Sequence, residues 1–156
     1  MRVHENAGSG GENVSPLFEE FKQSADLGSF AIGQPDASYI GIAASLKVTS
    51  LSGEKNRRVA NHAWGTGALV MKNIHAAFAC PNVAILEIPP LAVELYTEVF
   101  DRSFEMVDGY VLPPQKPGLG IRLTEKTKAK FPFVAGSGKF NRVLGKVLER
   151  PFVAQG

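Results

Sequence analysis

Four polar residues recur along the chain at a nearly constant interval, each where a short apolar run gives way to a helix pattern. They are Glu12, Asp36, His62 and Glu87, and intervals of 24, 26 and 25 residues separate them. An interval of this size fits one strand, one helix and two short loops. Because parallel α/β folds keep their chemistry at the carboxyl ends of the strands, we expect the four side chains to emerge side by side at one rim.

Hydrophobic periodicity predicts helices that alternate with strands. We expect helices over residues 17–27, 38–51 and 68–79 and strands over residues 30–34, 58–61 and 83–86. Ser38 is expected to cap the second helix. The last strand is a continuous apolar run, which is typical of a parallel strand covered on both faces.

Composition narrows the class of protein. With 156 residues, of which 44% are hydrophobic and 21% charged, the chain is typical of one globular domain. A net charge of +2 argues against a nucleic-acid or anionic-membrane partner. The lone Cys80 fits a reducing compartment, and neither a signal peptide nor a run of transmembrane length is visible. We therefore expect a soluble, cytoplasmic protein.

Several of the polar residues also have an ordinary structural explanation. Glu12 could favour the positive end of the helix that follows it, Asp36 could cap a helix, and His62 could be a surface loop residue. Trp64, close to His62, belongs to a residue type that more often packs than contacts substrate. The joint register of these residues favours a functional site more than any one of them does.

Five motifs give the chain a family resemblance. They are Gly-Gly-Glu-Asn at 10–13, Gln-Pro-Asp at 34–36, His-Ala-Trp-Gly-Thr-Gly at 62–67, Leu-Glu at 86–87 and Pro-Pro-Gln-Lys-Pro-Gly-Leu-Gly-Ile at 113–121. In this order the chain resembles the enolase superfamily, specifically the mandelate racemase and muconate lactonizing enzyme branch with its acid-sugar dehydratases. The resemblance implies an α/β fold that is the C-terminal part of a TIM-like (β/α)7β barrel, about the last three to four strands with their helices, plus an extended C-terminal segment.

The same resemblance implies a role for each polar residue. Glu12 would be a magnesium ligand on the fifth barrel strand, and Asp36 and His62 would form a dyad on the sixth and seventh, with His62 as the base. Glu87 would face the substrate from the eighth. Removing a proton next to a carboxylate creates a dianionic enediolate, so Mg²⁺ is the implied cofactor. A histidine suits proton abstraction, and a neighbouring carboxylate fixes its tautomer.

The resemblance also implies how the chain is divided. Residues 1–11 are expected to be a loop or disordered, residues 12–88 a partial enolase-type barrel, and residues 89–156 a C-terminal extension that in the family packs back toward the capping domain. A complete barrel of this kind needs roughly 250 residues. The family's capping domain, its lysine-containing strand and its first two metal carboxylates have no counterpart here, so we expect a C-terminal fragment.

Two functions follow as expectations. The first is part of a Mg²⁺-dependent lyase or isomerase that abstracts an α-proton from a sugar acid or similar carboxylate, as a dehydratase, racemase or cycloisomerase, and that is inactive alone. The alternative is a non-catalytic remnant or structural partner that associates with another barrel fragment or with itself. Both predict association, because half a barrel leaves unpaired strand edges and apolar surface.

Overall fold

The computed structural model describes residues 17–88, 104–132, 142–143 and 146–147. The chain divides into two compact units, Met1–Arg122 and Leu123–Gly156. The first contains α1 (Phe18–Asp26), β1 (Ile32–Gly33), α2 (Gly41–Glu54), β2 (Arg58–Asn61), α3 (Gly67–Phe78), β3 (Val83–Leu86), β4 (Met106–Val107) and β5 (Tyr110–Val111). Strands and helices alternate through β3, as the periodicity predicts.

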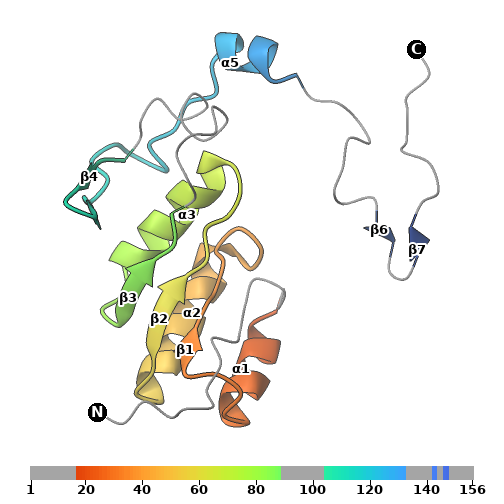
Figure 1. Ribbon diagram of the computed structural model, residues 1–156, viewed down its shortest axis with the longest axis vertical. Helices are drawn as coiled ribbons and strands as arrows, with labels where there is room; N and C mark the ends of the chain where they lie inside the picture. Colours follow the sequence, from red (N-terminus) through yellow and green to blue (C-terminus); the bar gives the residue numbers. More distant parts are fainter. Residues whose placement is uncertain (1–16, 89–103, 133–141, 144–145, 148–156) are drawn as a thin grey trace. The chain divides into compact units, whose positions relative to one another are not determined.

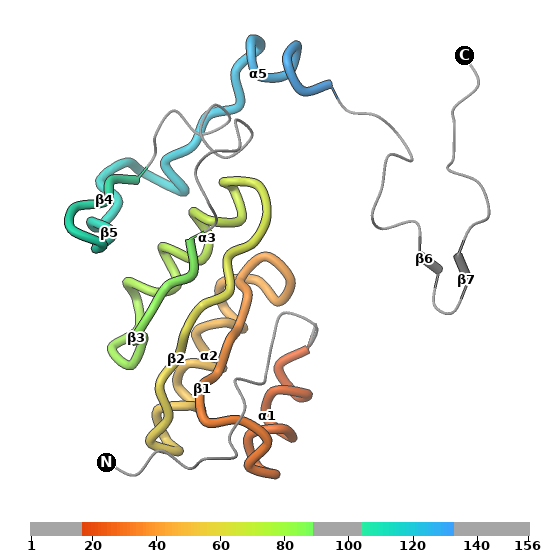
Figure 2. Tube along the Cα trace, viewed as in Figure 1, coloured from red at the N-terminus to blue at the C-terminus, as the bar shows by residue number. Residues whose placement is uncertain are grey.

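The centre of the first unit is a parallel sheet with strand order β1-β2-β3 (Figure 1). Ile32 pairs with Arg58 at its start, and Leu86 pairs with Asn61 at its end. A register shift between Val59 and Ala60 interrupts the pairing of β2 with β3. Because all three strands run the same way, their carboxyl ends share one edge of the sheet, which Figure 2 shows along the chain trace.

One face of this sheet carries the helices. On β2, Val59 and Asn61 are buried, whereas Arg58 is exposed, so side chains alternate between a covered and an open face. Ile85 pairs with Ala60 and is 66% exposed, which places it on the open face. The expectation that residues 83–86 are covered on both faces is therefore wrong for the part of the chain that the structure describes, because a single helix layer covers the sheet there.

The first hydrophobic cluster joins α1 and α2 to the start of the sheet. Its fully buried members are Phe21, Ala25, Phe30 and Val48. The Phe21 and Phe30 rings meet edge to face, with centroids 6.5 Å apart, a favourable arrangement for aromatic pairs. Phe30 lies just before β1, so its side chain anchors α1 against the helix layer.

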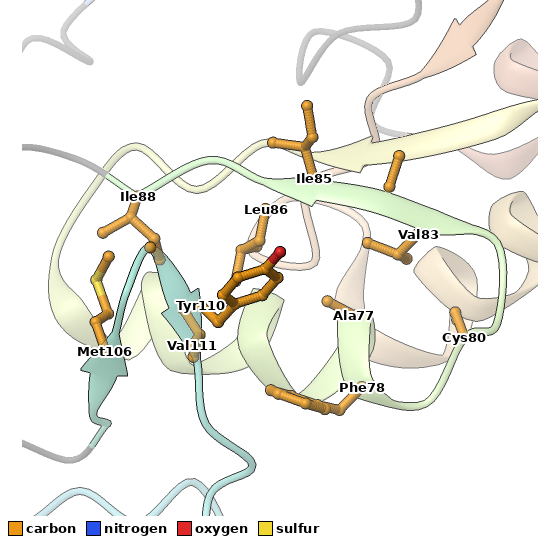
Figure 3. A pocket seen from close by; sticks show the side chains of 12 residues that line it. Ala77, Phe78, Cys80, Val83, Ile85, Leu86, Ile88, Met106, Tyr110 and Val111 are labelled. Carbon is orange, nitrogen blue, oxygen red and sulfur yellow. The ribbon is translucent and has the colours of Figure 1, made fainter.

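A second hydrophobic cluster lies on α3. It contains the buried Val70, Met71 and Ile74, and against them pack partly buried side chains from β3 and from the segment around the β4–β5 hairpin: Leu86, Ile88, Phe104, Val111, Leu119 and Ile121. The hairpin turns at Asp108 and Gly109, both with positive φ, as a two-residue hairpin turn of type I′ requires. Between the hairpin, α3 and β3 lies an apolar hollow of about 540 Å³ (Figure 3).

The second unit contains α5 (Glu125–Lys130) and the antiparallel pair β6 (Arg142–Val143) and β7 (Lys146–Val147). Thr124 caps α5, since its hydroxyl accepts a 3.1 Å hydrogen bond from the Thr127 amide. Among the described residues of the whole chain, no helix is both long and apolar enough to cross a bilayer.

Truncation of Phe30 should weaken the fold more than any exposed apolar change. Phe30→Ala removes a ring that is 2% exposed, and we expect it to lower the free energy of unfolding by about 3–5 kcal/mol. Leu27→Ala is the control, because Leu27 is 82% exposed and its loss should cost less than about 0.5 kcal/mol. Urea unfolding followed by circular dichroism measures both; equal costs would contradict the placement of Phe30 in this core.

Candidate active site

Three of the four polar residues lie together at the carboxyl edge of the sheet. Asp36 follows β1, His62 follows β2 directly, and Glu87 follows β3 directly. Main-chain hydrogen bonds continue beyond the strands: His62 N donates to Pro35 O at 3.1 Å, and Glu87 N donates to Asn61 O at 3.0 Å. The rim order expected from the spacing is therefore present for these three residues.

The closest contact among them joins Asp36 to His62. Asp36 Oδ2 and His62 Nδ1 are 2.9 Å apart. Asp36 is completely buried, and the side chain of His62 is 17% exposed. When Asp36 is ionised, its carboxylate can only accept hydrogen bonds, so a neutral His62 imidazole then carries its proton on Nδ1 and presents Nε2 as the basic nitrogen.

The other oxygen of Asp36 is held by two N–H donors. Ser38 N donates to Oδ1 at 2.7 Å, and Asn73 Nδ2 on α3 donates to the same atom at 2.8 Å. Asn73 is itself buried, and its Oδ1 accepts a 2.9 Å hydrogen bond from Ala37 N. A buried carboxylate is tolerated only when it is hydrogen-bonded in this way. The orientation of Asp36 is therefore fixed from both sides.

The start of α2 differs from the prediction. Ser38 was expected to cap the helix, but α2 begins at Gly41 after Ile40, which provides no side-chain cap. Asp36 organises this turn instead: its main-chain oxygen accepts from Tyr39 N and Ile40 N, while its side chain accepts from Ser38 N. The predicted cap at Ser38 is wrong because the turn that follows Asp36 delays the start of α2 to Gly41, so Ser38 does not occupy the N-cap position. Asp36 thus shapes this turn and also pairs with His62.

Glu87 approaches the opposite side of the imidazole. Its Oε2 is 3.8 Å from His62 Nε2, and its Oε1 accepts a hydrogen bond from Trp64 Nε1. Trp64 is 51% exposed, so its indole acts here as a hydrogen-bond donor at the rim and not as a core residue. In the loop after it, a Cβ on Gly65 would collide with the side chain of Leu69. Glycine at 65 therefore lets this loop close tightly onto the start of α3.

The predicted metal ligand, Glu12, lies outside the described residues. Within the described ranges, no three His, Cys, Asp or Glu side chains are grouped as a metal site. Asp36 is unsuited to the task, because N–H groups already occupy both of its oxygens. The described residues therefore do not by themselves fit a magnesium ion.

Sequence reasoning missed Asn73. This asparagine is not among the residues predicted for the site, although the structure places it against Asp36. A polar residue inside an otherwise apolar helix pattern is a usable signal, because asparagine is seldom fully buried without a specific partner.

The apolar hollow of Figure 3 is separate from this site, because none of Asp36, His62, Glu87 or Asn73 lines it.

Comparisons with known proteins agree with this arrangement. The family described as Enolase C-terminal domain-like matches residues 9–127. The D-galactonate dehydratase family member RspA of Pantoea ananatis is 35% identical over 99 residues, which are 62% of this chain and 24% of that protein. The chain thus spans about a quarter of the length of this curated relative.

Solved structures show the same relationship. An enolase from Pantoea ananatis with bound D-gluconate and Mg is 32% identical, with a TM-score of 0.65 over 75% of this chain and 29% of that one. A mandelate racemase/muconate lactonizing enzyme-like protein from Roseovarius sp. TM1035 is 28% identical, with a TM-score of 0.64 over 69% of this chain and 27% of that one.

The fold is accordingly the C-terminal part of a TIM-like barrel, with β1, β2 and β3 as its parallel strands. Its relatives include a D-galactonate dehydratase family member and a mandelate racemase/muconate lactonizing enzyme-like protein. The family match covers well over half of the sequence. The chain belongs to the enolase C-terminal domain-like family, in its mandelate racemase and muconate lactonizing enzyme branch.

Proposed function

We propose that this chain supplies the general base of an enzyme that removes the α-proton of a carboxylate substrate. His62 takes the proton at Nε2, and Asp36 holds the imidazole through Nδ1. The observation that carries the proposal is the 2.9 Å contact between His62 Nδ1 and a fully buried Asp36 carboxylate at the carboxyl edge of a parallel sheet. General-base catalysis of this kind contributes about 10²- to 10⁴-fold.

The charges around His62 suit this proton transfer. When the imidazole takes up the proton, it becomes positively charged between two carboxylates, Asp36 at Nδ1 and Glu87 at 3.8 Å from Nε2. Both stabilise the charge that forms. Trp64 holds Glu87 by its other oxygen, so Glu87 remains beside the substrate without replacing Asp36 as the partner of Nδ1.

The proposed substrate class is a sugar acid, as a dehydratase or a racemase or cycloisomerase would use. Support comes from the relatives, which include a D-galactonate dehydratase family member and an enolase with bound D-gluconate and Mg. In the complete enzyme Glu12 would be one magnesium ligand, and bound Mg²⁺ would supply positive charge beside the substrate carboxylate. We expect the present chain to be inactive alone, because one carboxylate holds magnesium weakly.

The tautomer of His62 tests the role of Asp36. In Asp36→Asn the new amide can present an N–H toward Nδ1, so we expect neutral His62 to change from the Nδ1–H to the Nε2–H form. Nitrogen-15 shifts of labelled histidine measure this directly. Glu87→Gln is the matched control and should leave the Nδ1–H form in place. Retention of the Nδ1–H tautomer in a folded Asp36→Asn variant would contradict the dyad.

Exchange of the α-proton with solvent deuterium tests the reaction. The chain is combined with the N-terminal part of RspA from Pantoea ananatis and assayed with Mg²⁺ on gluconate and galactonate. We expect exchange by the combined pair, none by the chain alone, and a loss of about 10²-fold or more with His62→Asn. The control is His75→Asn. His75 is a second histidine, which lies on α3, and its replacement should have little effect on the exchange rate. Undiminished exchange with His62→Asn would remove His62 as the base.

The second candidate function is that of a structural partner that associates through its sheet. It is favoured by the open face, where Ile32 is 39% and Ile85 is 66% exposed, and by β3, which among the described residues pairs only with β2. Exposed apolar strands of this kind promote pairing with other chains.

Light scattering tests this association. We expect oligomers of the isolated chain, and we expect Ile85→Lys to reduce their size by placing a charge on the open face. Ile42→Lys, a change on the exposed side of α2, is the control and should leave the size unchanged. A compact monomer of the unaltered chain at ordinary concentration would argue against association.

A further inference from the structure

We propose that Asn73 is a positioning residue for the His62 base. Its side-chain amide holds Asp36 so that Oδ2 faces His62, and it thereby selects the imidazole tautomer that carries its proton on Nδ1. The inference deepens the proposed function and rests on it, because the Nδ1–H form is the one that leaves Nε2 basic.

The hydrogen-bond network determines which way the Asn73 amide points. Ala37 N is a donor only, so the atom 2.9 Å from it must be the acceptor Oδ1. Nδ2 then faces two acceptors, Asp36 Oδ1 at 2.8 Å and Leu69 O at 3.2 Å. A flipped amide would place N–H against N–H and oxygen against carboxylate. The side-chain amide of Asn73 can therefore act only as a hydrogen-bond donor toward Asp36.

The donor at Asn73 determines how the Asp36 carboxyl group can bond to His62. Oδ1 receives N–H groups from both Ser38 and Asn73, which leaves no place for a proton on that oxygen. Oδ2 accepts from His62 Nδ1. An Asp36 carboxylate held in this way can receive only a proton-bearing Nδ1, so the tautomer of His62 depends on the donor at position 73.

Asn73 also contributes something that Ser38 does not. Ser38 belongs to the same turn as Asp36 and moves with it, whereas Asn73 lies on α3, the helix that begins shortly after His62. One buried side chain thus ties the turn after β1 to the helix that follows β2. The distance between Asp36 and His62 is set by this link as well as by the sheet.

Nitrogen-15 spectra of histidine-labelled chain test the proposal without any need for activity. Asn73→Leu keeps roughly the size of the side chain but removes both the N–H donor toward Asp36 and the acceptor for Ala37 N. We expect the ratio of Nδ1–H to Nε2–H forms of His62 to fall roughly tenfold, the effect of losing one hydrogen bond to a charged group. Asn73→Ala removes the donor together with most of the side chain and should lower the ratio in the same direction.

Asn82→Ala provides the matched control. Asn82 Nδ2 donates to Thr49 O at 2.9 Å and to Arg57 O at 3.3 Å, so its loss also removes side-chain hydrogen bonds to the main chain, but none to Asp36. The tautomer ratio should stay unchanged in this variant, even where its thermal stability falls as far as that of Asn73→Ala.

The outcomes separate this proposal from the proposed function. A lowered ratio in the folded Asn73→Ala variant, with an unchanged ratio in Asn82→Ala, supports the positioning role whether or not His62 proves to be the base in the exchange assay. An unchanged ratio in the folded Asn73→Ala variant overturns the positioning role, even if exchange by the combined pair still depends on His62.

Discussion

A completely buried carboxylate, that of Asp36, sets the constraint on which the rest of the site depends. An ionised group without water is stable only if hydrogen-bond donors surround it. Here three N–H groups do so, from Ser38, Asn73 and His62. They come from the turn after β1, from α3 and from the end of β2. These segments can donate to Asp36 together only when they lie in this arrangement, so the buried carboxylate also constrains the local fold.

The parallel sheet explains why these groups meet. Because its strands run in one direction, residues that follow them in the sequence gather at a single edge, and main-chain hydrogen bonds from His62 and Glu87 extend the pairing to that edge. The helices cover one face of the sheet. The other face exposes Ile85, which would be an interior residue if further strands closed the sheet into a barrel.

Much of this arrangement could be predicted from the sequence. The strands Arg58–Asn61 and Val83–Leu86 have the predicted bounds, and the regular interval placed Asp36, His62 and Glu87 correctly at one edge. Short-range pattern was less informative for β1, which is shorter than predicted because Phe30 packs on Phe21 instead of joining the strand. Glu12 stays a prediction.

Contacts between distant residues were not predictable from periodicity. Ser38 lies in a turn held by the side chain of Asp36 and does not cap α2, and Asn73 contacts Asp36 across 37 positions of the sequence. Nothing in a helix pattern specifies the partner of a buried asparagine. Trp64 likewise belongs to a residue type that usually packs in a core, but its indole N–H donates a hydrogen bond to Glu87 beside the carboxyl ends of the strands.

The most direct test of the account is a crystal structure of this chain assembled with the N-terminal part of a relative and a bound sugar-acid carboxylate. The account predicts that His62 Nε2 lies about 3–3.5 Å from the α-carbon of the substrate, the separation expected for reacting atoms, with Asp36 still hydrogen-bonded to Nδ1. A substrate whose α-carbon faces another base, with His62 turned away from it, would contradict the account.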